Sequence, residues 1–231
     1  MFLSLLLACD GAPDETGAPV AEDTGSGDTG WTGACPPRMV QVEDFCIDPF
    51  ETTLSADDLS VALGELDQSD VWPDTHVTAV ATPLEGVIPT VQLSWYQAYG
   101  ACLATGKHLC TVTEWQKACG DGELPWGNTP APEEVCAVPA PDGTTEWVEL
   151  QPTGSLPECR SPAGVFDQIG NAWEWADPES VSEGVPAAAK MGGAFYAGMG
   201  NAGCQIPPFL DHPPEFAGTI AARCCVEAPR R

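Results

Sequence analysis

The sequence predicts a loop-rich fold built from short elements rather than a helical bundle, and its composition supports this. Glycine and proline account for 24 and 23 of the 231 residues, and only 18% of the residues are charged. Hydrophobic residues make up 43% of the chain and include 8 tryptophans, enough for a sizeable core. The length allows one large domain or two small ones.

The charge of the chain is strongly acidic, with 34 Asp and Glu against 8 Lys and Arg and a net charge of −26. Such a chain repels phosphate backbones, so the sequence excludes nucleic acid as a partner. It would attract divalent cations and stay soluble through self-repulsion. The alternative is that the acidic residues simply form a solvated surface.

Residues 1–9 are predicted to be a lipoprotein signal peptide with its lipidated cysteine. The apolar run Met1–Ala8 ends at Cys9, and Leu6–Cys9 resembles the lipobox of bacterial lipoproteins, in which the cysteine thiol carries diacylglycerol. No Lys or Arg precedes Arg38, whereas export signals begin with positive charge, so we expect further residues upstream. The alternative is a short apolar end that is not processed.

Residues 10–34 are predicted to be a disordered acidic linker, because they contain six acids, no base and almost no large apolar side chain. The lipid on Cys9 would then supply the membrane contact. These features predict a protein anchored in a bacterial cell envelope, in the periplasm or at the cell surface.

The start of the body, residues 35–51, alternates apolar and polar residues around 39–42 and predicts two short strands linked by Glu43 and Asp44. Cys35 and Cys46 flank this hairpin and could be joined across it. Residues 52–90 are polar, with scattered proline and glycine, and are predicted to be a long loop or insertion.

Two helices carry capping-box patterns. Ser94 precedes Gln97 by three residues, which predicts a helix over 94–106 that ends at Gly106. Thr111 precedes Glu114 in the same way, and that helix would end at Gly120. Residues 120–164 are irregular, residues 190–196 indicate a short strand with a glycine pair, and residues 219–226 indicate a final strand.

The cysteine content points to disulfides formed in an oxidising compartment. Zinc is a weak alternative, because the chain has no CxxC pair and its 3 His do not cluster. A helix would place Cys110 and Cys119 roughly 13 Å apart, at about 1.5 Å per residue. Because a disulfide needs Cα atoms within about 7 Å, these two cysteines should not pair with each other.

The order of short motifs resembles the formylglycine-generating enzyme, or sulfatase-modifying factor, family. The Gly170–Trp175 run is the most specific of them. The matching residues span roughly 35–225 and include Cys35-Pro36, Met39-Val40, 45–48 with Glu51, Val91, Ser94-Trp95, 106–111, Glu114-Trp115, 125–127, Phe166-Asp167, 170–175, Gly192-Gly193 and Arg223-Cys224. The resemblance implies an irregular α+β domain over 35–231 with a core similar to C-type lectins.

Active members of this family oxidise a sulfatase cysteine to formylglycine with copper(I) held between two thiolates, a soft-ligand arrangement. By resemblance, those thiols would fall at Ala197 and Ala202, just after the glycine pair. Cys204 is the only thiol nearby, so we expect no catalytic residues and no copper site.

The resemblance also implies a structural calcium site, because the family binds calcium with the segment matching 167–174. The ligands carried over are the side chains of Asp167 and Glu174 and the carbonyl oxygens of Gly170 and Ala172. The alternative is that Trp173 and Trp175 form a core plug and that Glu174 caps a turn without metal.

Two disulfides follow from the resemblance, Cys119–Cys204 and Cys102–Cys224. Three more are assigned only by sequence proximity and by the cysteines left over, namely Cys35–Cys46, Cys136–Cys159 and Cys110–Cys225.

These features favour a non-catalytic binding or structural module, expected to be a monomer, that presents loops such as 52–90 and 128–160 to a protein or glycan. The alternative function is a formylglycine-generating oxidase, which would need Cys204 and a second reduced thiol such as Cys225. A third possibility is a different chemistry in the same groove of the fold. The sequence gives it no support, because it shows no Ser-His-Asp set and no His-based iron motif.

Overall fold

The computed structural model describes residues 35–55, 79–127, 129–140, 149–179, 181–182, 185–186, 188–197, 202–211 and 218–228. All of these belong to the compact unit Trp31–Arg231. The signal peptide, Cys9 and the linker predicted over residues 1–34 lie outside the described residues. Among the described helices, none has the length and apolar character needed to cross a bilayer.

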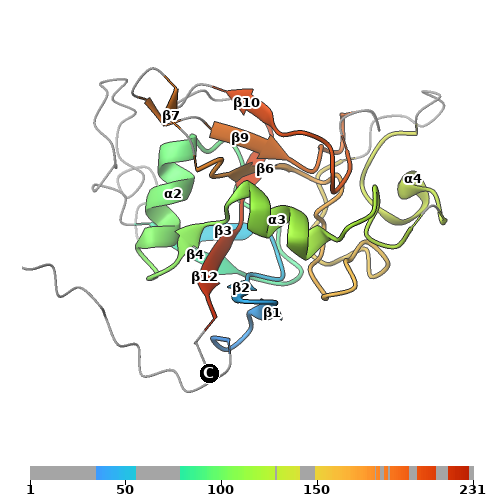
Figure 1. Ribbon diagram of the computed structural model, residues 1–231. Helices are drawn as coiled ribbons and strands as arrows, with labels where there is room; N and C mark the ends of the chain where they lie inside the picture. The colour runs from blue at the N-terminus through green and yellow to red at the C-terminus, as the bar shows by residue number, and fades with distance from the viewer. Residues whose placement is uncertain are drawn as a thin grey trace, which may run out of the picture. The chain divides into compact units, whose positions relative to one another are not determined.

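One four-stranded sheet contains the predicted hairpin. Its order is β1 (Val40–Val42), β2 (Phe45–Ile47), β12 (Cys224–Glu227) and β5 (His108–Leu109), all antiparallel. Residues 43 and 44 form the turn between β1 and β2, as the alternating pattern predicted. The C-terminal strand β12 lies between β2 and β5, so the sheet joins the two ends of the described chain (Figure 1).

The second four-stranded sheet has the order β10 (Phe209–Asp211), β9 (Ala188–Met191), β6 (Trp173–Ala176) and β11 (Ile220–Ala222). Strand β11 is parallel to β6, and the other neighbours are antiparallel. Strand β9 ends before the glycine pair, because Gly192 and Gly193 have φ of 84° and 81°. The strand expected over 190–196 is therefore displaced toward the N-terminus.

The prediction of a single final strand over 219–226 is wrong. The chain forms β11 and β12 in two different sheets, and Arg223 lies between them. Both strands keep apolar side chains buried, whereas the buried side chain of Arg223 needs acidic and carbonyl partners. The chain changes sheet at the residue whose side chain cannot pack as an apolar group.

Both predicted capping boxes are confirmed. Helix α2 (Trp95–Leu103) begins after Ser94, whose Oγ accepts from the Gln97 N–H at 3.1 Å while the Gln97 side chain accepts from the Ser94 N–H. Helix α3 (Val112–Cys119) begins after Thr111 in the same way. Helix α2 is shorter than predicted, because Ala104 caps it before Gly106.

The segment predicted as a long loop over 52–90 contains a two-stranded sheet at its flanks. Strand β3 (Thr52–Ser55) pairs with β4 (Val80–Pro83), with Leu54 opposite Ala81 and both side chains buried. The described residues also form the short helix α4 (Pro132–Val135) and the strand pair β7 (Val181–Ser182) and β8 (Val185–Pro186). The fold is thus α+β with short, irregular elements.

Tryptophans occupy the centres of the core. Trp95 and Trp175 lie in one buried cluster and Trp115 in another, each with 0% of its surface exposed. Helix α2 contacts β4, β5 and β6, which places the first cluster between this helix and the strands (Figure 1). Of the two tryptophans on β6, Trp175 is fully buried and Trp173 only partly.

Candidate functional site

The two positions where the sequence analysis located the family's thiols carry alanine methyl groups. Ala197 is 9% exposed and Ala202 is 1% exposed, both after the glycine pair. The first glycine of the pair cannot be replaced without strain, because a Cβ on Gly192 would lie 2.5 Å from the carbonyl oxygen of Gln168. The described residues at the two predicted positions therefore carry buried apolar side chains.

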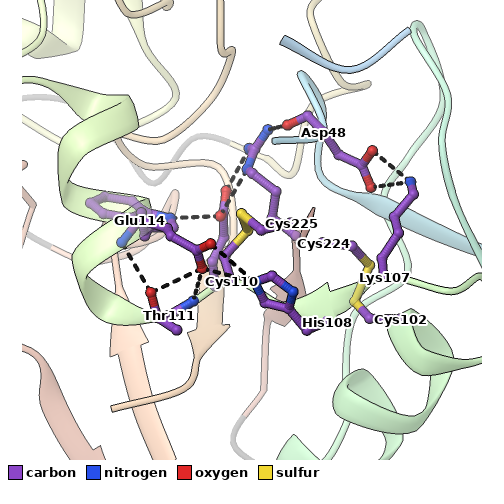
Figure 2. The surroundings of a disulfide bond; sticks show 12 residues. Asp48, Cys102, Lys107, His108, Cys110, Thr111, Glu114, Cys224 and Cys225 are labelled. Carbon is purple, nitrogen blue, oxygen red and sulfur yellow. Dashed lines mark hydrogen bonds and ion pairs between the residues drawn. A yellow bond between two sulfur atoms is a disulfide. The ribbon is translucent and has the colours of Figure 1, made fainter. Parts of the chain in front are cut away.

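Each cysteine of the described residues is bonded to another. The bonds are Cys35–Cys46, Cys102–Cys224, Cys110–Cys225, Cys119–Cys204 and Cys136–Cys159, the same five pairs that the sequence analysis gave. Figure 2 shows the neighbours Cys224 and Cys225 reaching two different partners. Cys204 and Cys225, the thiols that the oxidase alternative needs, are both in disulfides and fully buried.

Arg223 is the centre of a buried polar cluster. Its Nε and Nη2 donate to the two carboxylate oxygens of Glu174, at 3.0 and 2.7 Å. Its Nη1 donates to the carbonyl oxygen of Asp48 at 2.9 Å, and Nη2 also donates to that of Phe166 at 2.8 Å. Trp115 Nε1 donates to Glu174 Oε2 at 2.7 Å. Both oxygens of Glu174 are thus engaged by donors.

Glu51 is a second buried carboxyl beside this cluster. Its Oε1 accepts from the backbone N–H of Ala172 at 3.1 Å, and its Oε2 accepts from Asn171 Nδ2 at 2.6 Å. Burial raises the pKa of Glu51 well above its usual range, and the nearby charges of Asp167 and Glu174 raise it further. Glu51 therefore ties β3 to the loop before β6.

Asp167 is the third carboxyl of the cluster and is 3% exposed. Its Oδ2 accepts from the backbone N–H of Gly154 at 2.7 Å. Burial raises the pKa of Asp167 to about 6, against the lowering effects of that hydrogen bond and of Arg223. Asp167 therefore ionises only above the pH range usual for an aspartate.

Lys107 and Asp48 form a further ion pair at the edge of the cluster. The Lys107 Nζ lies 2.7 Å from Asp48 Oδ1 and 2.8 Å from Oδ2 (Figure 2). Burial raises the pKa of Asp48 although Lys107 and Arg223 act to lower it. The cluster thus includes four carboxyl groups and two basic side chains.

A surface pocket of about 690 Å³ lies between α3 and the β1–β2 hairpin, and the sequence analysis did not identify it. His108 Nε2 lies 3.0 Å from Glu114 Oε2 (Figure 2), and Lys117 pairs with Glu43 at 2.7 Å. Burial opposes ionisation of Glu114, but the hydrogen bond and charge of His108 lower its pKa overall. The pocket is lined by 41, 43–45, 108, 111, 113, 114, 117, 179, 227 and 228.

Residues 14–206 match a family model described as a sulfatase-modifying factor enzyme 1-like domain. The chain belongs to the sulfatase-modifying factor family. The resemblance read from the Gly170–Trp175 run and its companion motifs is thereby confirmed.

Curated relatives of this family member include both inactive and active enzymes by name. The chain is 26% identical to the inactive C-alpha-formylglycine-generating enzyme 2 of Mus musculus over 156 residues, covering 62% of this chain and 50% of the relative. It is 32% identical to the formylglycine-generating enzyme of Mycobacterium tuberculosis over 102 residues, covering 39% of this chain and 33% of the relative. The matches thus span half or less of these curated relatives.

Solved structures support the fold of the family member. Treponema denticola variable protein 1 has a TM-score of 0.52 at 13% identity, covering 86% of this chain and 94% of that chain. A structure titled CarF has a TM-score of 0.52 at 15% identity, covering 86% and 96%. At these identities the likeness concerns the fold alone.

The side chains predicted to hold calcium also have protein partners. Calcium takes about six to eight oxygen ligands, and a carboxylate that accepts hydrogen bonds can still bind a metal ion. Glu174 accepts on both oxygens, from Arg223 and Trp115, and Asp167 accepts from Gly154 through Oδ2. Within the described part of the chain, no group of three or more His, Cys, Asp or Glu is arranged to hold a metal. The calcium site at 167–174 stays a prediction.

Sequence reasoning missed the pairing of Arg223 with Glu174. A signal was present, because Arg223 is the only charged residue in the otherwise apolar run 219–226 of a chain with 8 basic residues. An isolated charge in such a run predicts a buried partner of opposite sign. Nothing comparable in the sequence identified the partner as Glu174.

Proposed function

We propose that this member of the sulfatase-modifying factor family is a non-catalytic binding or structural module. The observation that carries the proposal is that every described cysteine is in a disulfide, while alanines occupy the positions inferred for the two thiols. Copper(I) held between two thiolates needs two reduced sulfurs near each other. Cys9, outside the described residues, is a single thiol and cannot supply both ligands.

The disulfide bond of Cys204 also supports the proposal. Its bond to Cys119 anchors the segment after Ala202 to the end of α3, and both sulfurs belong to a buried apolar cluster. Cys204 could bind copper only if its disulfide bond with Cys119, which joins residues 85 positions apart, were broken. The oxidase alternative therefore conflicts with the packing of this segment.

The test is an assay of the purified full chain with a Cys-x-Pro-x-Arg peptide, copper(I) and oxygen, read by mass spectrometry for formylglycine. We expect no product, and we expect thiol titration of the native protein to find at most one reactive thiol. Formylglycine in the peptide, or two native thiols whose reactivity is blocked by copper, would refute the proposal and favour the oxidase.

A matched variant tests whether the alanine positions are the right ones. The double substitution Ala197→Cys and Ala202→Cys restores sulfur at both places without altering the glycine pair. We expect the variant to bind copper(I) with two thiols protected from titration, whereas the wild type binds none in this way. Failure of the variant to protect its thiols would show that the proposed equivalence of these positions is wrong.

We also propose that a lipid on Cys9 holds the module in a bacterial cell envelope, where it contacts a protein or glycan. The support is the lipobox-like Leu6–Cys9 sequence and the acidic segment that follows it. Metabolic labelling with an alkyne fatty acid in an expressing bacterium is expected to mark the wild type and not Cys9→Ser. Equal labelling of both would contradict lipidation at Cys9.

A further inference from the structure

We infer that the pocket between α3 and the β1–β2 hairpin binds a guanidinium group, supplied by arginine side chains of a peptide or of this chain itself. The pocket has a volume of about 690 Å³. Ligand sites in proteins typically measure about 300–1,000 Å³. No cysteine and neither residue of the glycine pair lines the pocket. The inference is therefore independent of whether the module is catalytic.

Separate parts of the chain form the walls of the pocket and are joined to one another. Strand β12 pairs with β2 on one side and with β5 on the other. The N–H of Ala228, just after β12, donates to the carbonyl oxygen of Asp44 in the hairpin turn at 2.8 Å. His108 on β5 contacts Glu114 on α3 at 3.0 Å (Figure 2). The pocket is thus built into the sheet and the helix beside it.

Carboxylates outnumber the basic groups that line the pocket. The basic groups are Lys117 and His108, and the acids are Glu43, Asp44, Glu114, Glu179 and Glu227. Among the residues that the structure describes, Asp44, Glu179 and Glu227 have no ion-pair partner. All three are exposed, so a cation that enters the pocket can contact them. The lining therefore favours a positively charged ligand.

Lys117 shows how these carboxylates act on a cation. Its Nζ lies 2.7 Å from Glu43 Oε2. The hydrogen bond and charge of Glu43 raise the pKa of Lys117, and the charges of Asp44 and Glu114 raise it further. The pocket thus favours the charged form of a basic group that lies in it.

The sequence that follows the pocket is an observation independent of the carboxylates. Arg230 and Arg231 stand two and three positions after Ala228, which lines the pocket. They are two of only 8 basic residues in the chain. An extended chain spans at most about 3.6 Å per residue, so both Cα atoms lie within about 11 Å of that of Ala228. Two guanidinium groups, which can bind carboxylates through paired hydrogen bonds, are therefore within reach of the pocket.

The test is an NMR titration of the full chain with the peptide Gly-Arg-Arg-Gly, acetylated and amidated at its ends. The ring signals of His108 report on the pocket, because His108 lines it. The control peptide carries citrulline in place of arginine, which keeps the shape and removes the charge. We expect the arginine peptide to shift the His108 signals in a saturable way and the citrulline peptide to leave them unchanged.

Two double variants separate binding in the pocket from general attraction to a chain of net charge −26. Glu179→Gln with Glu227→Gln removes two lining carboxylates, whereas Asp121→Asn with Glu158→Gln removes two exposed ones elsewhere. We expect the dissociation constant to rise about 3–10-fold in the first variant and to stay unchanged in the second. Equal weakening in both variants overturns the inference.

A third variant, Arg230→Ala with Arg231→Ala, identifies the source of the guanidinium group. Tighter peptide binding than in the wild type supports the inference and shows that the chain's own arginines compete for the pocket. Equal binding supports it with a separate peptide as the source. The inference is overturned when neither the wild type nor this variant gives a saturable shift of the His108 signals.

Discussion

Replacing the buried Asp167 by asparagine is expected to stabilise the domain at neutral and alkaline pH. Asparagine has nearly the same shape as the protonated carboxyl group and can still accept from the Gly154 N–H. It cannot ionise, so the variant avoids the cost of a negative charge that is buried and lies near Glu174. A polar substitution in the core should therefore raise the free energy of unfolding.

The magnitude follows from the pKa of Asp167, which burial raises from 3.8 to about 6. Because the folded pKa is the higher one, the folded state holds the proton more tightly than the unfolded chain. The wild type therefore loses stability as pH rises from about 4 through 6, by about 3 kcal/mol once both states are ionised. The advantage of the variant should grow from about 1.5 kcal/mol near pH 5 to about 3 kcal/mol near pH 8.

The assay is urea unfolding followed by tryptophan fluorescence across this pH range, with the buried Trp95, Trp115 and Trp175 as reporters. Asp44→Asn is the matched control, because Asp44 is exposed and its substitution should leave the pH dependence unchanged. A stability difference between Asp167→Asn and wild type that stays constant or shrinks with rising pH would refute the reasoning.

Three further predictions concern other parts of the fold and can be measured by the same unfolding assay. Arg223→Met leaves Glu174 buried without its cation and should cost about 3–5 kcal/mol. Gly192→Ala should cost about 1–3 kcal/mol, because φ is 84° and the new Cβ would lie 2.5 Å from a carbonyl oxygen. Gly127→Ala should cost only about 1 kcal/mol, because Gly127 has a similar φ of 91° but open space around it. Ser94→Ala removes the cap of α2 and should cost about 1 kcal/mol.

Controls separate these effects from general damage. Lys117→Met breaks an ion pair whose side chains are 42% and 63% exposed, so it should leave the free energy of unfolding nearly unchanged. An Arg223→Met cost as small as this would contradict the importance of burial. Equal losses at Gly192 and Gly127 would contradict the steric argument.

Features set by neighbouring residues were predictable from the sequence. The capping boxes at Ser94 and Thr111 and the turn at residues 43 and 44 depend on side chains within three positions of the backbone they satisfy. Local signals therefore located the starts of both helices. The exclusion of a Cys110–Cys119 bond also depended only on helix geometry, and the structure agrees.

Features set by distant residues were not predictable in this way. Strand β3 pairs with β4 across a connection of 24 residues, and its short polar sequence resembles a loop until that partner is present. The pairing of Glu174 with Arg223 joins residues 49 positions apart, so nothing near Glu174 in the sequence indicated it. The family resemblance located the segment but not the partner that occupies its carboxylate.

The neighbouring half-cystines Cys224 and Cys225 have a consequence for oxidative folding. An isomer that exchanges their partners, Cys102 and Cys110, would close loops differing by only one residue from the native ones, so chain entropy barely distinguishes the two. Successive side chains of a strand point to opposite faces, which gives each sulfur a direction only after β12 has paired. Correct oxidation at this end of the chain therefore depends on prior docking of the last strand.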